Sequence, residues 1–201
     1  MFDRHLRPLI DPPLNRIGAR LAGAGVHPDK VTLTGLFLGL LAAGAVALGV
    51  FWLALGMVLL SRLADGLDGA VARARGITDF GGYLDIVADF MFYAAIPLAF
   101  VWYDPVANGL AGAFLLASFY VNGATFLGFA VLAEKRRMRT DAQGVKSLYY
   151  SAGLLEGSET IFFFALICLF PTAFAPLAAI FGALCIFTAI SRILLAARLF
   201  R

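Results

Sequence analysis

The chain has 201 residues, of which 61% are hydrophobic and only 14% are charged, and its formal net charge is +3. Soluble domains carry roughly 25% charged residues, so this composition excludes an ordinary soluble protein and predicts an all-α integral membrane protein. A nucleic-acid partner is not expected, because the basic residues are spread over several connections and no polar domain gathers them.

The first part of the chain is expected to lie on the membrane. Residues 1–27 are predicted to form an amphipathic, juxtamembrane segment, followed by a transmembrane catalytic domain of residues 28–201. The apolar stripe of this segment consists of Leu14, Ile17 and Leu21. Pro12 and Pro13 should break it, and Asp29 should cap the helix that follows.

Six apolar segments follow, each close to the ~20 residues that a helix needs to cross a bilayer. They are expected at residues 31–49, 51–73, 82–102, 108–133, 152–171 and 174–197. The first contains a stripe of small residues, Gly35, Gly39 and Ala43, which predicts close packing against a neighbouring helix.

The basic residues predict the orientation of these segments. All 16 Lys and Arg residues lie before residue 31, around the end of the second segment, between the fourth and fifth segments, or near the C-terminus. The opposite connections carry one charged residue, Asp104. By the positive-inside rule, both termini are cytosolic in a cell or inner membrane.

Four aspartates stand out in this apolar chain. Asp65 and Asp68 are three residues apart near the end of the second segment, and Asp85 and Asp89 are four apart near the start of the third. Each pair therefore projects from one helix face. Because the link between the two segments is short, an antiparallel hairpin should bring all four within ~5–13 Å of the cytosolic helix ends.

Four ionised carboxylates at one place require cations. We count Arg73 as the cation near them, so divalent metal is the simplest source of further positive charge, and oxygen ligands suit Mg²⁺ or Mn²⁺. Two ions would clamp a pyrophosphate for displacement at phosphorus. An ion-coupled transporter with an intramembrane Asp relay and an aspartate-rich membrane prenyltransferase are the alternatives, besides a purely structural role.

The acidic pattern also resembles a known signature. It reads Asp65-x-x-Asp68-Gly69-x-x-Ala72-Arg73, then seven residues, then Gly81-x-x-x-Asp85-x-x-x-Asp89. This resembles the signature of the CDP-alcohol phosphatidyltransferase family. The resemblance implies a phospholipid biosynthetic transferase, commonly a homodimer, in which an alcohol attacks a CDP-linked lipid, usually CDP-diacylglycerol, and CMP is released.

The same resemblance implies roles for individual residues. Asp65, Asp68 and Asp85 would bind one metal ion, and Asp65, Asp85 and Asp89 a second. Asp89 would also be the general base for the acceptor hydroxyl. The residues implied in binding the CDP-linked lipid are Gly69, Arg73, Thr78, Gly81, Asp29 and Thr32.

A separate cluster of basic residues is the candidate binding site for the acceptor alcohol. Its members are Lys135, Arg137, Arg139 and Lys146, with Arg192. We expect them to bind a phosphate on the acceptor, which favours a phosphorylated polyol such as glycerol 3-phosphate. The alternative is that the cluster only fixes topology and binds anionic membrane lipid.

Overall fold

The computed structural model describes residues 3–136 and 157–200, and every regular element in these ranges is a helix. The α-helices are α1 (Asp3–Gly23), α2 (Pro28–Ala47), α3 (Phe51–Arg75), α4 (Asp79–Tyr103), α5 (Pro105–Lys135), α7 (Gly157–Leu169) and α8 (Phe174–Leu199). A short 3₁₀ turn, η1 (Pro171–Ala173), precedes α8. The expectation of an all-α protein is confirmed.

Four of these helices, α2, α4, α5 and α8, are long and apolar enough to cross a membrane. Helix α3 has 25 residues, but Arg62, Asp65 and Asp68 interrupt its apolar run. The described part of α7 is apolar and 13 residues long. The protein is therefore an integral membrane protein by the length and composition of its helices.

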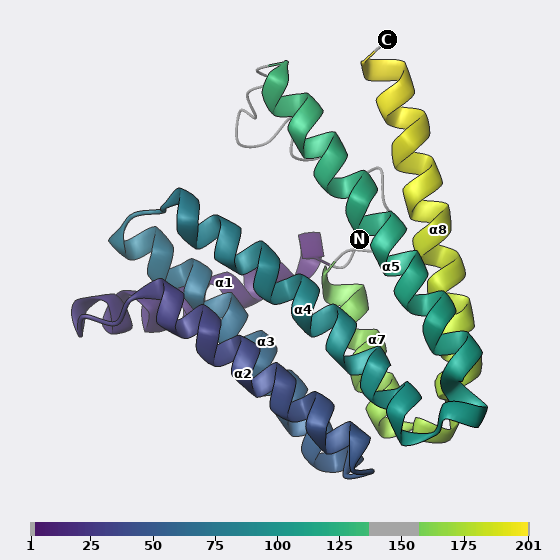
Figure 1. Ribbon diagram of the computed structural model, residues 1–201. Coiled ribbons are helices and arrows are strands. Elements are labelled where there is room, and N and C mark those ends of the chain that lie inside the picture. The colour runs from purple at the N-terminus through teal and green to yellow at the C-terminus, as the bar shows by residue number, and fades with distance from the viewer. Residues whose placement is uncertain (1–2, 137–156, 201) are drawn as a thin grey trace.

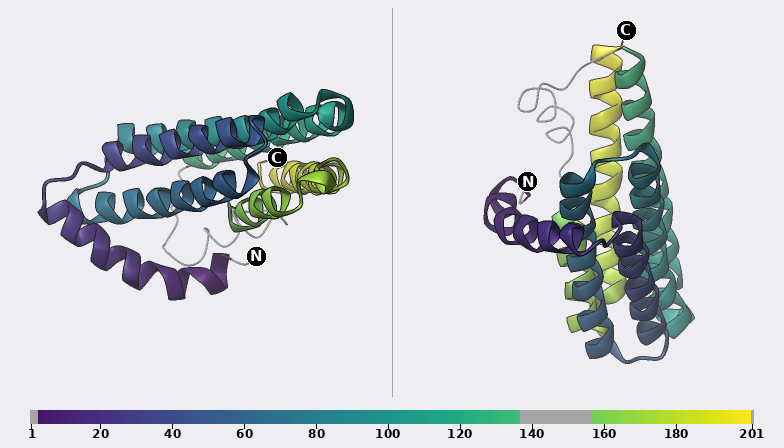
Figure 2. Two further views of the ribbon diagram at one scale, coloured as in Figure 1. Left: turned by 90° about the horizontal axis from the view of Figure 1, so that it is seen from below. Right: turned by 90° about the vertical axis from the view of Figure 1, so that its left-hand side faces the viewer.

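The helices form two groups that meet at one end (Figure 1). Helix α2 packs along both α3 and α4, and α5 packs along α8. Helix α7 packs on α3, and the contact of α4 with α5 joins the two groups. Helix α1 packs on α3 and lies across the direction of the other helices (Figure 2).

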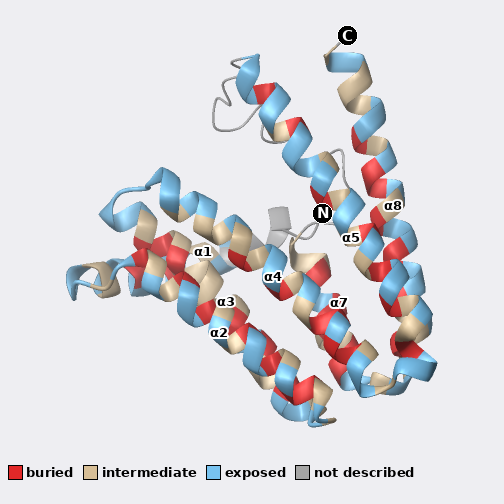
Figure 3. Ribbon diagram, viewed as in Figure 1, coloured by how far each residue is buried: buried red, intermediate tan, exposed pale blue. Residues whose placement is uncertain are grey.

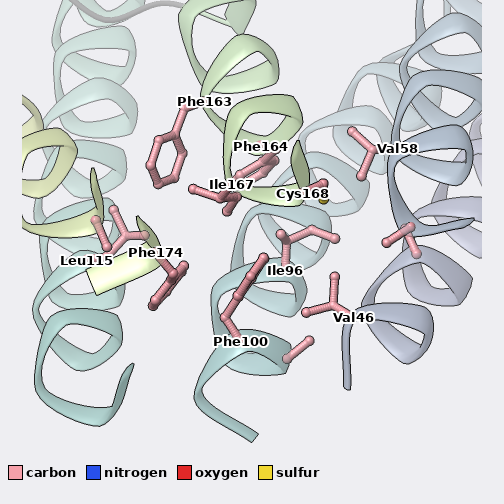
Figure 4. Packing of buried hydrophobic residues seen from close by; sticks show 14 of the residues in the cluster. Val46, Val58, Ile96, Phe100, Leu115, Phe163, Phe164, Ile167, Cys168 and Phe174 are labelled. Atoms are coloured by element: carbon pink, nitrogen blue, oxygen red, sulfur yellow. The ribbon is translucent and has the colours of Figure 1, made fainter. Parts of the chain in front are cut away.

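Aromatic side chains fill the core where the two groups meet (Figure 4). The rings of Phe100 and Phe174 are stacked with centroids 4.6 Å apart, and Phe92 meets Phe164 edge to face at 5.4 Å. The outward positions are exposed (Figure 3), and many of them are apolar, such as Leu110 at 89%. Buried contacts between helices with apolar outer faces are typical of a bundle surrounded by lipid.

The stripe of small residues on α2 has the packing role predicted for it. Gly35 and Gly39 are buried, and Ala43 is partly buried against the core. A Cβ atom on Gly39 would lie 2.6 Å from Cδ2 of Phe92 and 3.1 Å from Oγ of Ser61. Only glycine therefore allows α2 to approach α3 and α4 this closely.

The predicted break at Pro12 and Pro13 is wrong, because α1 continues through both residues. Both prolines are exposed, so the carbonyl oxygens left without a helical donor can be hydrated. Leu14 and Gly18, by contrast, are buried. Packing of this second half of α1 against α3 therefore sustains the helix beyond the prolines.

The predicted apolar stripe of α1 is correct at Leu14, which is buried, and at Leu21, which is half-buried. Ile17 is 44% exposed, and Gly18 takes the inward position instead. The reason is close approach: a Cβ atom on Gly18 would lie 2.6 Å from Cβ of Ala70 on α3. A residue with a larger side chain would hold the helices apart.

The predicted cap at Asp29 is also wrong. Helix α2 begins at Pro28, and the N-cap is His27, whose backbone is extended and whose side chain makes no capping hydrogen bond. Proline favours the first helical position because its φ is already helical and its missing N–H would have no partner there. Asp29 therefore lies inside the first turn, where its charge complements the helix dipole.

Replacing Gly18 with Val should weaken the contact between α1 and α3, because the added side chain would overlap Ala70. Overpacking of this kind costs about 1–3 kcal/mol. We expect a lower apparent melting temperature for the detergent-solubilised protein. Gly23→Val is the matched control, because a Cβ atom at Gly23 meets nothing within 4 Å. Equal shifts in the two variants would contradict the close packing of α1.

Candidate active site

Three of the four aspartates converge at the end of α3 and the start of α4. Asp65, Asp68 and Asp85 each offer a carboxylate oxygen, and these oxygens all lie within 4.8 Å of one another. Asp68 is buried, and its Oδ2 atom has no hydrogen-bond partner. A buried, unpartnered carboxylate oxygen is unfavourable without a cation. The three side chains therefore fit a divalent metal ion that prefers oxygen ligands, such as Mg²⁺ or Mn²⁺.

The fourth aspartate, Asp89, lies outside this group and is paired differently. Its Oδ1 accepts a hydrogen bond from Nη1 of Arg62 at 2.6 Å. The same nitrogen lies 3.3 Å from Oδ1 of Asp65. The Arg62 side chain is only 7% exposed, so this is an ion pair inside the helix bundle.

Arg62 is the site residue that the sequence analysis missed. The positive-inside pattern includes Arg62 among the charges that set orientation, and the sequence interpretation considers only Arg73 as a cation near the aspartates. Two signals were available: Arg62 is three residues before Asp65, a spacing that places both on one helix face, and it interrupts an apolar helix. The distance to Asp89 depends on how α3 and α4 pack.

Helix α2 brings two of the residues implied in lipid binding next to the carboxylates. Thr32 is buried beside the carboxyl group of Asp68, and its hydroxyl donates to the carbonyl of Pro28 at 3.2 Å. Oδ1 of Asp29 is buried without a partner, and a Cβ atom on Gly81 would lie 3.5 Å from it. The start of α2 therefore faces the start of α4 at the site.

Thr78 has a clear structural role as the N-cap of α4. Its Oγ1 accepts a hydrogen bond from the backbone N–H of Gly81 at 3.0 Å. A Cβ atom on Gly81 would lie only 2.9 Å from that oxygen, so glycine permits the close turn. This cap fixes the start of the helix that carries Asp85 and Asp89.

Arg73 is exposed and connects α3 to α1. Its Nε and Nη2 donate to Oδ1 of Asn15 at 3.3 and 2.8 Å. Gly69 lies one turn earlier, and a Cβ atom there would lie 3.3 Å from Nη1 of Arg73. Asn15 was not predicted as a site residue, because nothing in its sequence context distinguishes it from other polar residues of α1.

The structure describes only two of the residues expected to bind the acceptor, Lys135 and Arg192. Lys135 is exposed at the end of α5. Arg192 is buried on α8 and its Nη1 donates to α5: to the carbonyl and Oδ1 of Asn122, both at 3.0 Å, and to Oγ1 of Thr125 at 2.8 Å. Its hydrogen bonds to described residues therefore join α5 to α8 and do not involve the aspartates. Arg137, Arg139 and Lys146 lie outside the described residues.

Comparison with known proteins gives a consistent result across the chain. A model of the CDP-alcohol phosphatidyltransferase family matches residues 25–198. Inner membrane protein YnjF of Escherichia coli is 49% identical over 193 residues, which are 96% of this chain and 94% of YnjF. An archaetidylinositol phosphate synthase of Pyrococcus horikoshii is 39% identical over 92 residues, 45% of this chain and 49% of that protein.

The fold is also found among solved structures. The crystal structure of Mycobacterium tuberculosis phosphatidylinositol phosphate synthase with CDP-DAG bound has a TM-score of 0.70 to this chain. The match covers 90% of this chain and 91% of the other at 23% sequence identity. A second structure of that protein is in complex with manganese and citrate. At this identity the likeness establishes a shared fold.

The carboxylate cluster predicts a measurable metal affinity. Asp68→Ala should weaken Mn²⁺ binding by at least about tenfold, the scale on which metal sites respond to the loss of a supporting group. Titration of the detergent-solubilised protein, followed by calorimetry or by the EPR signal of free Mn²⁺, measures this. Asp79→Ala is the matched control, because Asp79 is an exposed acid in the first turn of α4. Unchanged affinity in Asp68→Ala would contradict the site.

Proposed function

The chain belongs to the CDP-alcohol phosphatidyltransferase family, and from this membership we propose that it transfers a phosphatidyl group from CDP-diacylglycerol to an alcohol and releases CMP. The observation that carries the proposal is the group of three convergent carboxylates with a fourth, paired carboxylate beside it. A transporter relay has no need for three oxygens within 4.8 Å of one another. A metal site that binds a pyrophosphate does need such a group.

In the proposed reaction the acceptor hydroxyl oxygen forms a bond to the β-phosphorus of the CDP-linked lipid. The bond from that phosphorus to the oxygen bridging it to CMP breaks, and CMP leaves with the electron pair. Asp89 takes the proton of the attacking hydroxyl as general base, which requires it to lie within hydrogen-bond reach of that oxygen. Its side chain is 29% exposed, so an acceptor can approach it.

The metal site serves the diphosphate of this substrate. Asp65, Asp68 and Asp85 would hold one Mg²⁺ or Mn²⁺ ion, and Asp65, Asp85 and Asp89 a second. Bound divalent ions supply positive charge to the diphosphate oxygens and the leaving CMP.

The nucleotide of the CDP-linked lipid is proposed to lie where α2, α3 and α4 meet. The residues proposed to bind it are Asp29, Thr32, Gly69, Arg73, Thr78 and Gly81. The unpartnered Oδ1 of Asp29 supports this, because it can accept a hydrogen bond from an amino or hydroxyl group of the nucleotide. Gly69 and Gly81 leave the backbone open to close approach, and Arg73 supplies a charge for phosphate.

For the acceptor we propose a phosphorylated polyol, with glycerol 3-phosphate as one candidate. The support is the basic cluster Lys135, Arg137, Arg139 and Lys146, with Arg192, since Arg binds phosphate through two parallel hydrogen bonds. Two relatives are named archaetidylinositol phosphate synthase and phosphatidylinositol phosphate synthase, which agrees with this class, whereas a third is named CDP-diacylglycerol–serine O-phosphatidyltransferase.

We further propose six membrane crossings, by α2, α3, α4, α5, α8 and the apolar segment of residues 152–171, to which α7 belongs. Residues 1–27 are proposed to lie on the membrane surface and residues 28–201 to form the catalytic domain. The basic residues support a cytosolic site and cytosolic termini. Arg73 and Arg75 end α3, Lys135 ends α5, and Arg198 lies in the last turn of α8. The connection between α4 and α5, which consists of Asp104, lies at the end of these helices away from the α3–α4 connection (Figure 1). A homodimer is the proposed assembly.

The purified protein should release CMP from CDP-diacylglycerol when Mg²⁺ or Mn²⁺ and the correct acceptor are present, with each candidate acceptor tested in turn. Chelation of divalent ions should abolish the release, and adding them back should restore it. Asp89→Asn should lower kcat by about 100-fold or more, the usual contribution of a general base, while CDP-lipid binding is retained. Asp79→Asn is the control. Full activity in chelator, or in Asp85→Asn, would contradict the metal mechanism.

The orientation is tested by labelling with a membrane-impermeant thiol reagent. Cysteines placed at Asp104 or Thr172 should react from outside the cell, and one placed at Thr140 should react only after the membrane is opened. The native Cys168 and Cys185 are buried, so the background is low. The reverse pattern would place the carboxylates on the side opposite to cytosolic CDP-lipids.

A further inference from the structure

Arg62 lies well inside α3 and is almost fully enclosed. Its side chain is 7% exposed. A guanidinium removed from water in an apolar bundle is unfavourable unless carboxylates and hydrogen-bond acceptors surround it. Arg62 must therefore be surrounded by such groups, and neither the metal site nor the family signature explains why an arginine lies at this position.

Three helices fix the guanidinium. Nη1 contacts Oδ1 of Asp89 on α4 at 2.6 Å and Oδ1 of Asp65 on α3 at 3.3 Å. Nη2 donates to Oγ of Ser61 at 3.2 Å, and Ser61 in turn donates to the carbonyl of Gly35 on α2 at 2.7 Å. The face of the guanidinium lies 4.1 Å from the centre of the Phe92 ring.

The orientation of Arg62 provides hydrogen bonds to the two carboxylates but leaves one of its own donors without a partner. Its Nε is buried without a hydrogen-bond partner. One donor is thus left unsatisfied while Nη1 bridges two aspartates on different helices. Nη2 at the same time binds Ser61, so the branched guanidinium spans both aspartates and this hydroxyl, which a single ammonium nitrogen does not do in the same geometry.

The contact determines what Asp89 can do. Of the two carboxylate oxygens of Asp89, Oδ1 makes a hydrogen bond within the described part of the chain, and its partner is Arg62. Asp89 is thereby held beside the three-carboxylate group without joining it. Its second oxygen, Oδ2, is left to receive a proton.

We propose that Arg62 is a positioning residue for the general base: its guanidinium holds Oδ1 of Asp89 and Oδ1 of Asp65, and directs Oδ2 of Asp89 to the hydroxyl of the acceptor. This inference rests on the proposed transferase function. Arg62 contacts no substrate in this role and acts only through Asp89. A purely structural Arg62 would lower the stability of the protein but would not lower the kcat of the folded protein through Asp89.

A double-mutant cycle separates these two roles. Arg62→Gln should lower kcat on the order of 100-fold with the KM for CDP-diacylglycerol nearly unchanged, the upper range for loss of a supporting residue. In the Asp89→Asn background the same substitution should change kcat by no more than about twofold, the scatter expected for additivity. Arg62→Lys should recover part of the activity, because charge returns without the branched geometry. Arg75→Lys, an exposed position on the same helix, is the control.

Two further measurements remove the effects of misfolding. Mn²⁺ affinity should persist in Arg62→Gln, because Asp65, Asp68 and Asp85 remain. In chelator, the apparent melting temperatures of wild type, Arg62→Gln, Asp89→Asn and the double variant should be non-additive, which tests the contact without catalysis.

The outcomes distinguish the inference from the function on which it rests. If the wild type is active but the kcat losses of Arg62→Gln and Asp89→Asn multiply, or if either Arg62 variant keeps wild-type kcat, the positioning role is overturned. If the wild type releases no CMP with any acceptor, the proposed function fails. The cycle of melting temperatures then still reports whether Arg62 and Asp89 are coupled, and additive shifts there would also overturn the inference.

Discussion

The need to compensate four carboxylates inside an apolar helix bundle governs the structure around the site. Three of them converge on a place for a divalent ion, and Arg62 neutralises the fourth. Both solutions require α2, α3 and α4 to lie close together, which Gly35 and Gly39 permit. The small residues of α2 therefore contribute indirectly to the chemistry: without their close approach, Ser61 could not reach the α2 backbone and Arg62 would lose part of its support.

The segments outside this group also converge on it. Helix α1 meets α3 through Leu14 and Gly18, and Asn15 hydrogen-bonds Arg73. These contacts fall between and just after the signature aspartates of α3. The sequence predicts only membrane attachment for the segment that forms α1. In the structure, α1 also contacts α3, the helix that carries Asp65 and Asp68.

The sequence predicted the helices and the aspartate pairs because both depend on local periodicity. Asp65 and Asp68 share a face in any helix, and the apolar runs place the helices to within a few residues. Arg62 and Asn15 were missed because their partners, Asp89 and Arg73, lie on other helices. Pro12 and Pro13 misled because tertiary packing of Leu14 and Gly18 outweighs a local preference. Asp29 was misassigned because Pro28 starts α2 one residue earlier and leaves its carboxylate for the site.

The pairing of α5 with α8 has a mechanical consequence. Arg192 binds three oxygens of α5, and Arg136 at the end of α5 donates to the carbonyl of Phe200 just beyond α8. These hydrogen bonds connect the two helices within their length and at their C-terminal ends. A single residue, Asp104, separates α4 from α5. Movement of α5 relative to α8 would break these hydrogen bonds, so we expect the two helices to move as one unit. Lys135, at the end of α5, would then change its distance to the aspartates together with α8.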